Sequence, residues 1–217
     1  MEPNQDISTI CVATFSRIAA SISHEIKNTL SIINENAGLL DDLAAMSGDD
    51  GCVPGDRVKA ATTSIIRQVA RSNLIMKNLN RFAHSGDVPI ARVDVDETLT
   101  LAVALSSRQA AMRQVTVSHA GPAALDLQTN PQVLLSLLFN LLCHIVQQLP
   151  GGSEVVVEAA QEAERITFKF RQNPPSTAPI AEPESQEQLL LDHLQATLVD
   201  DPAAFGFSLP KTLHRDL

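Results

Sequence analysis

Hydrophobic residues recur every three or four positions through most of the first half of the chain. Residues 5–46 contain no proline, and their apolar spacing predicts a long amphipathic helix. Turn formers at 47–56 interrupt the pattern, and residues 57–83 resume it with the spacing of heptads. The two stripes are Phe15, Ile18, Ile22, Ile26, Leu30, Ile33, Ala37 and Leu40, and Val58, Thr62, Ile65, Val69, Ser72, Met76, Leu79 and Ala83.

These two helices, joined by a short turn, predict a long antiparallel helical hairpin. A single hairpin has too few neighbours to bury both apolar stripes. We therefore expect two copies to associate as a homodimer with a four-helix bundle. The predicted hairpin domain covers residues 1–86.

The pattern becomes mixed after a predicted linker at 84–90. Short apolar runs predict strands, longer periodic runs predict helices, and Asn130 followed by Pro131 is a candidate helix start. The strands are expected at 91–95, 115–118, 124–127, 155–159 and 166–170, and the helices at 96–113, 131–148, 186–198 and 205–217. Residues 91–217 are thus predicted to form a second domain, and the chain belongs to the α+β class.

The composition of the chain argues against a nucleic-acid partner. The chain has 217 residues, with 16 Lys and Arg against 25 Asp and Glu, and a formal net charge of −9. Nucleic acid is held mainly by Lys and Arg, so we expect no nucleic-acid partner. Aromatic residues are only 3% of the chain, which leaves few platforms on which bases could stack.

The cysteines and the N-terminus indicate an intracellular protein. Cys11, Cys52 and Cys143 are odd in number and widely spaced, which favours a reducing compartment over a disulfide framework. The N-terminus lacks the pattern of a signal peptide. The apolar run 133–146 is too short and too polar to span a bilayer. We expect a cytoplasmic protein with no membrane partner.

The other reactive or charged side chains are expected to have no catalytic or metal-binding role. No His, Cys, Asp or Glu cluster has ligand spacing, so no metal is expected. The acids between 182 and 187 are expected to be the solvated start of a helix. Cys143, in the most apolar predicted helix, is expected to be a small core residue.

His24 lies opposite the apolar stripe of the first helix. At about 100° per residue it falls about 180° from the mean direction of the stripe, and Asn28 lies about 40° from it. Glu25 flanks the histidine. His24 is therefore predicted to face solvent, where position alone would indicate an ordinary exposed histidine.

Residues 23–30, SHEIKNTL, resemble the H-box of the sensor histidine kinases. In that motif a phosphorylatable histidine is followed by an acid and, four residues on, by Asn or Thr. The resemblance implies that His24 accepts a phosphoryl group. It also implies that Glu25 acts in acid–base chemistry and that Asn28 positions the phosphoryl group or a water. The chemistry is reasonable, because a neutral imidazole is a good nucleophile towards phosphorus.

The resemblance extends along both predicted helices. It continues to Leu40 in the first, and Leu79–Ala83, LNRFA, resembles the L-x-x-F-A end of the second. It implies that the hairpin is a dimerisation and histidine-phosphotransfer domain. The implied partner is the receiver domain of a response regulator.

Residues 91–217 resemble the ATPase domain of these kinases, a small α/β sandwich, in the order of their elements. The family's N-box, N-L-x-x-N-A, corresponds to residues 140–145. Asn140 is retained, but His144 replaces the second Asn, which binds magnesium in the family. Mg²⁺ prefers oxygen ligands, so we expect His144 to be a core or interface residue.

Two further nucleotide motifs are altered. Gln172 or Asn173 stands where the family's D-x-G-x-G motif has its Asp, and prolines follow. Residues 204–208 correspond to G-L-G-L-S but keep only Gly206, and glycine is absent from 153–205. A phosphate loop normally needs glycine for close backbone approach. The domain is therefore expected to be degenerate, with no cofactor.

The favoured hypothesis is a histidine phosphotransferase that relays a phosphoryl group between receiver aspartates through His24. One alternative is an ATP-dependent histidine autokinase with a divergent site for Mg-ATP. Another is a non-catalytic module that binds a response regulator, or a phosphatase that uses Glu25 and Asn28. A purely structural helical dimer is the plainest alternative.

Overall fold

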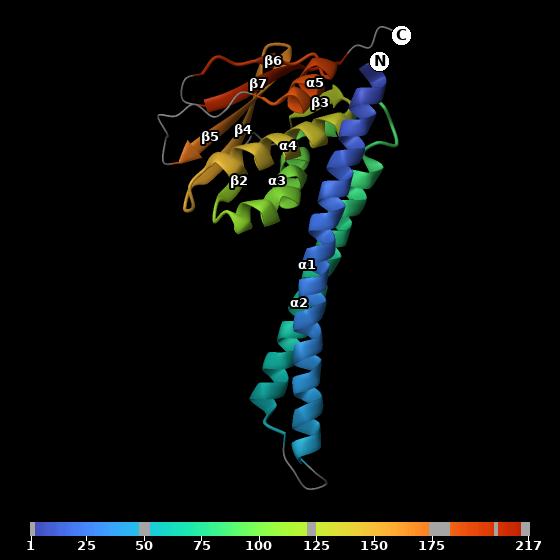
Figure 1. Cartoon of the computed structure of the whole chain (residues 1–217), viewed down its shortest axis with the longest axis vertical. Helices are drawn as coiled ribbons and strands as arrows, with labels where there is room; N and C mark the ends of the chain where they lie inside the picture. The colour runs from blue at the N-terminus through green and yellow to red at the C-terminus, as the bar shows by residue number, and fades with distance from the viewer. Residues whose placement is uncertain (1–2, 48–52, 121–124, 174–182, 202–203, 214–217) are drawn as a thin grey trace. The chain divides into compact units, whose positions relative to one another are not determined.

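The computed structural model describes residues 3–47, 53–120, 125–173, 183–201 and 204–213 (Figure 1). The helices are α1 (Pro3–Ser47), α2 (Gly55–His84), α3 (Val95–Met112), α4 (Pro131–Gln148) and α5 (Ser185–His193). The strands are β1 (Ala91–Asp94), β2 (Thr116–Ala120), β3 (Asp126–Thr129), β4 (Glu154–Glu162), β5 (Arg165–Asn173), β6 (Thr197–Leu198) and β7 (Ala204–Pro210). None of the described helices is long and apolar enough to cross a membrane. The α+β class is confirmed.

The chain forms two compact units, and the division falls within α1. Residues 18–80 form one unit, called here the hairpin unit. Residues 1–17 and 81–217 form the other, called the globular unit. The predicted division at residues 86–91 instead assigned the whole of α1 to the hairpin. The start of α1 groups with the C-terminal part of the chain because it packs against α4, as described below.

The hairpin unit buries only part of the predicted stripes. Ile18 and Ile22 are buried, as the pattern indicated, whereas Leu30, Val69 and Met76 are exposed. Each helix has a single helical neighbour in the described unit, so one apolar face of the pair stays uncovered. Polar residues share the buried face with the aliphatic ones. The buried residues of this unit are Ile18, Ser21, Ile22, Thr29, Leu43, Ala61 and Gln68.

The globular unit is built on a five-stranded sheet with strand order β2-β4-β5-β7-β6. The pairing of β2 with β4 is parallel, and the other pairings are antiparallel. Phe168, Phe170 and Phe207 are buried, and α3 and α4 lie against one face of the sheet (Figure 1). A separate antiparallel pair joins β1 and β3. The core therefore lies between the helices and one face of the sheet.

The helix α4 is buried almost all round, and its start is the one that the sequence predicts. The side chain of Asn130 accepts a hydrogen bond from the amide of Val133 at 3.0 Å, and Pro131 occupies the first turn. The polar residues Ser136 and Asn140 are buried together with the leucines. A helix buried on all sides needs partners for such polar groups.

The predicted C-terminal helix at 205–217 is wrong over the described residues, because β7 occupies 204–210. Phe205 and Phe207 alternate with small residues and pair with Phe170 and Phe168 of β5. This period of two is the pattern of a strand. Likewise α5 ends at His193, before the expected residue 198, because residues 197–198 form β6. Residues 214–217 and Ala124, at the start of another predicted strand, lie outside the described residues.

Candidate functional site

His24 and Asn28 lie one turn apart on α1, and both are exposed. The predicted orientation of the histidine is thus the one that the structure has. Within the described part of the chain, neither side chain forms a hydrogen bond or an ion pair. The imidazole is therefore accessible to a reactant from solvent.

Glu25 and Thr29 follow these two residues and face α2. The Glu25 carboxylate lies 3.6 Å from the guanidinium of Arg71, and its side chain is only 15% exposed. The Thr29 hydroxyl lies 2.7 Å from that of Ser72 and donates to the carbonyl of Ile26 at 2.8 Å. Consecutive residues of α2 therefore hold consecutive turns of α1.

These contacts fix the rotation of α1 within the hairpin unit. With Glu25 and Thr29 turned inwards, His24 and Asn28 must point outwards. The carboxylate of Glu25 is engaged with Arg71 rather than with the imidazole. The sequence analysis did not predict a role for Arg71. Its position one residue before the heptad residue Ser72 could have indicated that it lies beside the contact between the two helices.

Asn140, the retained N-box residue, forms hydrogen bonds through both polar atoms of its side chain within the globular unit. Its amide nitrogen donates to the hydroxyl of Thr14 at 3.0 Å, and its oxygen accepts from Arg17 at 2.9 Å. The guanidinium of Arg17 also lies 5.5 Å from the ring centre of Phe139. Asn140 is 6% exposed. The start of α1 thus uses both polar atoms of the amide.

His144 joins α4 to α5, as an interface histidine would. Its Nδ1 lies 2.9 Å from an oxygen of Glu187, and the two side chains are 15% and 5% exposed. Glu187 also accepts from the backbone amide of Glu184 at the start of α5. The prediction of solvated acids at 182–187 is therefore wrong for Glu187, because this carboxylate is the buried partner of a histidine. Glu182 lies outside the described residues.

The remaining candidate positions lie in the sheet. Gln172 and Asn173 end β5, and the Asn173 amide donates to Glu154 at 3.3 Å. Gly206 lies inside β7, where a Cβ would come within 2.9 Å of the carbonyl oxygen of Phe168. A tight strand pairing therefore requires this glycine. The expected correspondence of 204–208 with a phosphate loop is wrong, because these residues form a strand.

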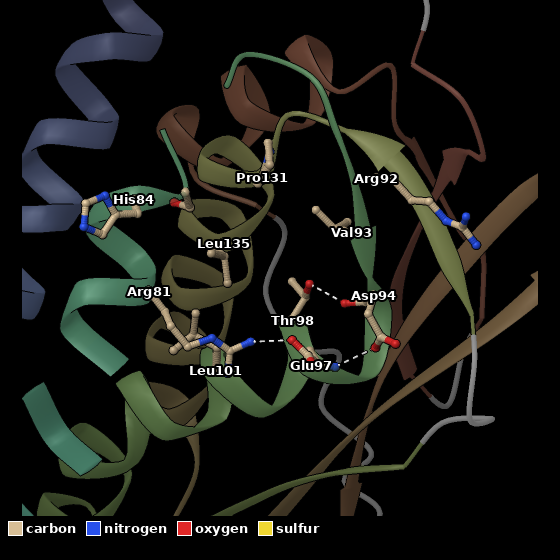
Figure 2. Close-up of a pocket in the computed structure, with 11 residues that line it drawn as sticks. Arg81, His84, Arg92, Val93, Asp94, Glu97, Thr98, Leu101, Pro131 and Leu135 are labelled. Carbon is tan, nitrogen blue, oxygen red and sulfur yellow. Dashed lines mark hydrogen bonds and ion pairs between the residues drawn. The ribbon is translucent and has the colours of Figure 1, made fainter. Parts of the chain in front are cut away.

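A cavity of about 390 Å³ opens in the globular unit near the end of α2 and the starts of α3 and α4 (Figure 2). Its charged side chains are largely paired. Arg81 donates to Glu97 at 2.8 Å, and Arg92 pairs with Asp126. Because these charges offset one another, the cavity offers no strong attraction for an ion.

The described residues provide neither a metal-binding cluster nor a reactive thiol. These residues contain no group of three or more His, Cys, Asp or Glu that could hold a metal. Burial raises the pKa of the Cys143 thiol to about 11, and burial also raises the pKa of Cys11. Both thiols stay protonated near neutrality and are poor nucleophiles. Cys52 lies outside the described residues.

The comparisons with known proteins point to one family. No family model matches the chain. Over 152 residues the chain is 27% identical to the sensor histidine kinase ZraS of Klebsiella oxytoca. This match covers 70% of the chain but only 31% of the kinase, so the chain spans about a third of its length.

Solved structures of histidine kinases are also similar to the chain. The catalytic domain of histidine kinase ThkA is 10% identical, covers 58% of this chain and 100% of that one, and has a TM-score of 0.49. Acinetobacter baumannii histidine kinase AdeS is 9% identical, with 87% and 98% covered and a TM-score of 0.47. Both scores are below 0.5, and the relationship rests on the sequence match. By that match the chain is similar in sequence to a sensor histidine kinase.

Proposed function

We propose that the chain is a histidine phosphotransferase of two-component signalling. His24 receives a phosphoryl group from the aspartate of one receiver domain and passes it to another. The observation that carries the proposal is the pairing of Asn140 with Thr14 and Arg17, which engages both the nitrogen and the oxygen of the N-box amide within the protein. His24, by contrast, is exposed and free to react.

The chemical step needs only the imidazole and the phosphorylated receiver. The unprotonated ring nitrogen attacks phosphorus, so that an N–P bond forms and the P–O bond to the carboxylate breaks. The carboxylate leaves with the electron pair, and the other ring nitrogen can release its proton to water. Asn28, one turn away, can donate its amide hydrogens to the phosphoryl oxygens. Transfer to the second receiver is the reverse reaction.

Mg-ATP fits the described residues poorly. An imidazole replaces an oxygen ligand at His144, and that imidazole is already bound to Glu187. The amide of Asn140 is occupied, and Gly206 belongs to a strand. We therefore derive no step through ATP, and the globular unit acts in this proposal as a docking or structural domain.

The proposal is tested by comparing two phosphoryl donors. Purified protein is incubated with labelled Mg-ATP at millimolar concentration, or with a panel of receiver domains phosphorylated by labelled acetyl phosphate. We expect acid-labile, alkali-stable label from a receiver and none from ATP. Label from ATP would favour the autokinase. Label from neither donor, with a receiver still bound, would favour the binding module or phosphatase.

The proposal includes a homodimer formed through the uncovered apolar face of the hairpin unit. Ile66, Val69 and Met76 are exposed on α2 at heptad-like spacing, and Leu30 is exposed on α1. An exposed stripe of this kind is typical of a bundle interface.

The variant Ile66→Glu is expected to weaken the dimer about 100-fold or more, because a charge would be buried without a partner. Analytical ultracentrifugation measures the change. Ala60→Glu is the matched control, because this exposed residue lies about 120° from Ile66 around α2. An unchanged dimer in Ile66→Glu would place the interface elsewhere.

A further inference from the structure

Arg71 combines a polar contact to the H-box with a large exposed surface. Its guanidinium lies 3.6 Å from the Glu25 carboxylate, and its side chain is 60% exposed. Among the described residues, the structure gives it no second ion pair. A guanidinium has five N–H donors, so most of them remain available.

Arg71 lies on the same side of the hairpin unit as His24 and Asn28. In an antiparallel pair of right-handed helices, a two-fold axis between the helices relates equivalent positions and keeps them on one side. His24 and Asn28 each precede an inward residue of α1, Glu25 and Thr29. Arg71 precedes the inward residue Ser72 of α2, which contacts Thr29 at 2.7 Å. All three side chains therefore emerge on one side, within about two turns along the axis, and the guanidinium of Arg71 reaches as far as Glu25, the neighbour of His24.

The electrostatics favour an exchange of partners at Arg71. A carboxylate carries one negative charge, whereas a phosphoryl group carries about −1.5 to −2 and has three acceptor oxygens. Guanidinium groups match phosphate geometry in a two-pronged contact. The 3.6 Å separation from Glu25 is longer than a charge-assisted hydrogen bond, so the existing pair is weaker than a two-pronged contact with a phosphoryl group.

We infer that Arg71 binds the phosphoryl group on His24, releasing the Glu25 carboxylate as it does so. This inference rests on the proposed function and adds a residue from α2 to the site. Arg71 donates hydrogen bonds to the phosphoryl oxygens in the transition state and in phosphohistidine. It moves no proton and forms no covalent bond.

The test uses a donor that has no protein surface, so that receiver docking cannot contribute. Phosphoramidate phosphorylates histidine directly, because the ring nitrogen displaces ammonia from phosphorus. The rate of phosphohistidine formation is measured on the full chain. Arg71→Gln is expected to be slowed about 10-fold or more, and Arg71→Lys to recover part of the rate. Arg67→Gln is the control, since it removes the same charge from an exposed residue one turn away and should react like the parent.

A double variant separates contact with the phosphoryl group from an effect through Glu25. Arg71→Gln is expected to slow the reaction also in a Glu25→Gln background. An effect that vanishes in that background, or an unchanged rate in Arg71→Gln with its circular dichroism preserved, would overturn the inference. The receiver experiment is independent. If no receiver transfers a phosphoryl group, but the reaction with phosphoramidate still depends on Arg71, the relay is rejected and the role of Arg71 is retained.

Discussion

The variant His24→Gln should take up no label from a phosphorylated receiver, a loss of about 1000-fold or more, because an amide cannot act as the nucleophile. His24 is exposed and without a side-chain partner in the described residues, so its replacement should leave stability within about 0.5 kcal/mol of the parent. Phosphotransfer assays and thermal unfolding of the same preparation measure both effects.

His84→Gln is the matched control for this variant. His84 is also an exposed helical histidine, at the end of α2, and its side chain contacts Asp87. The control should accept label as the parent does. Acid-labile label that persists in His24→Gln would place the phosphoryl acceptor on another residue and would reject the role inferred from the H-box.

The variant His144→Leu should lower the free energy of unfolding by about 3 kcal/mol, because the buried Glu187 carboxylate loses its side-chain partner. Urea denaturation followed by circular dichroism measures the loss. The effect arises in the globular unit, where this pair joins α4 to α5.

The double variant His144→Leu with Glu187→Leu should recover most of that stability. Replacing both partners of a buried pair by apolar side chains is often close to neutral. A loss below about 1 kcal/mol in the single variant would show that Glu187 finds another partner or water. Recovery in the double variant would identify His144 as a structural residue that pairs with Glu187, and not as a metal ligand.

The sequence predicts local structure well where one pattern dominates. The helical period of 5–46 and 57–83, and the cap formed by Asn130 and Pro131, appear in the structure nearly as expected. The segment 204–210 is a strand where a helix was expected, because a run this short carries little periodic signal of its own. Neighbouring strands decide such a segment, and they are distant in sequence.

The site was predictable on α1 but not across helices. The outward direction of His24 follows from helix geometry alone, whereas the pair of Glu25 and Arg71 depends on the register of the hairpin. The partners of Asn140 lie more than a hundred residues away along the chain. Local sequence patterns cannot predict such a contact, because it forms only when the start of α1 packs against α4.

That docking has a consequence for how the chain is made. Ile7, Ile10 and Cys11 are buried in the globular unit, and Thr14 meets Asn140 across 126 residues of sequence. At a synthesis rate of about 5–20 residues per second, the ribosome needs roughly 6–25 s to make the partner after the first segment has emerged. During that interval Ile7, Ile10 and Cys11 have no native partner in α4 to pack against. These residues are therefore synthesised well before they can reach their final environment, and a chaperone can bind them in the meantime.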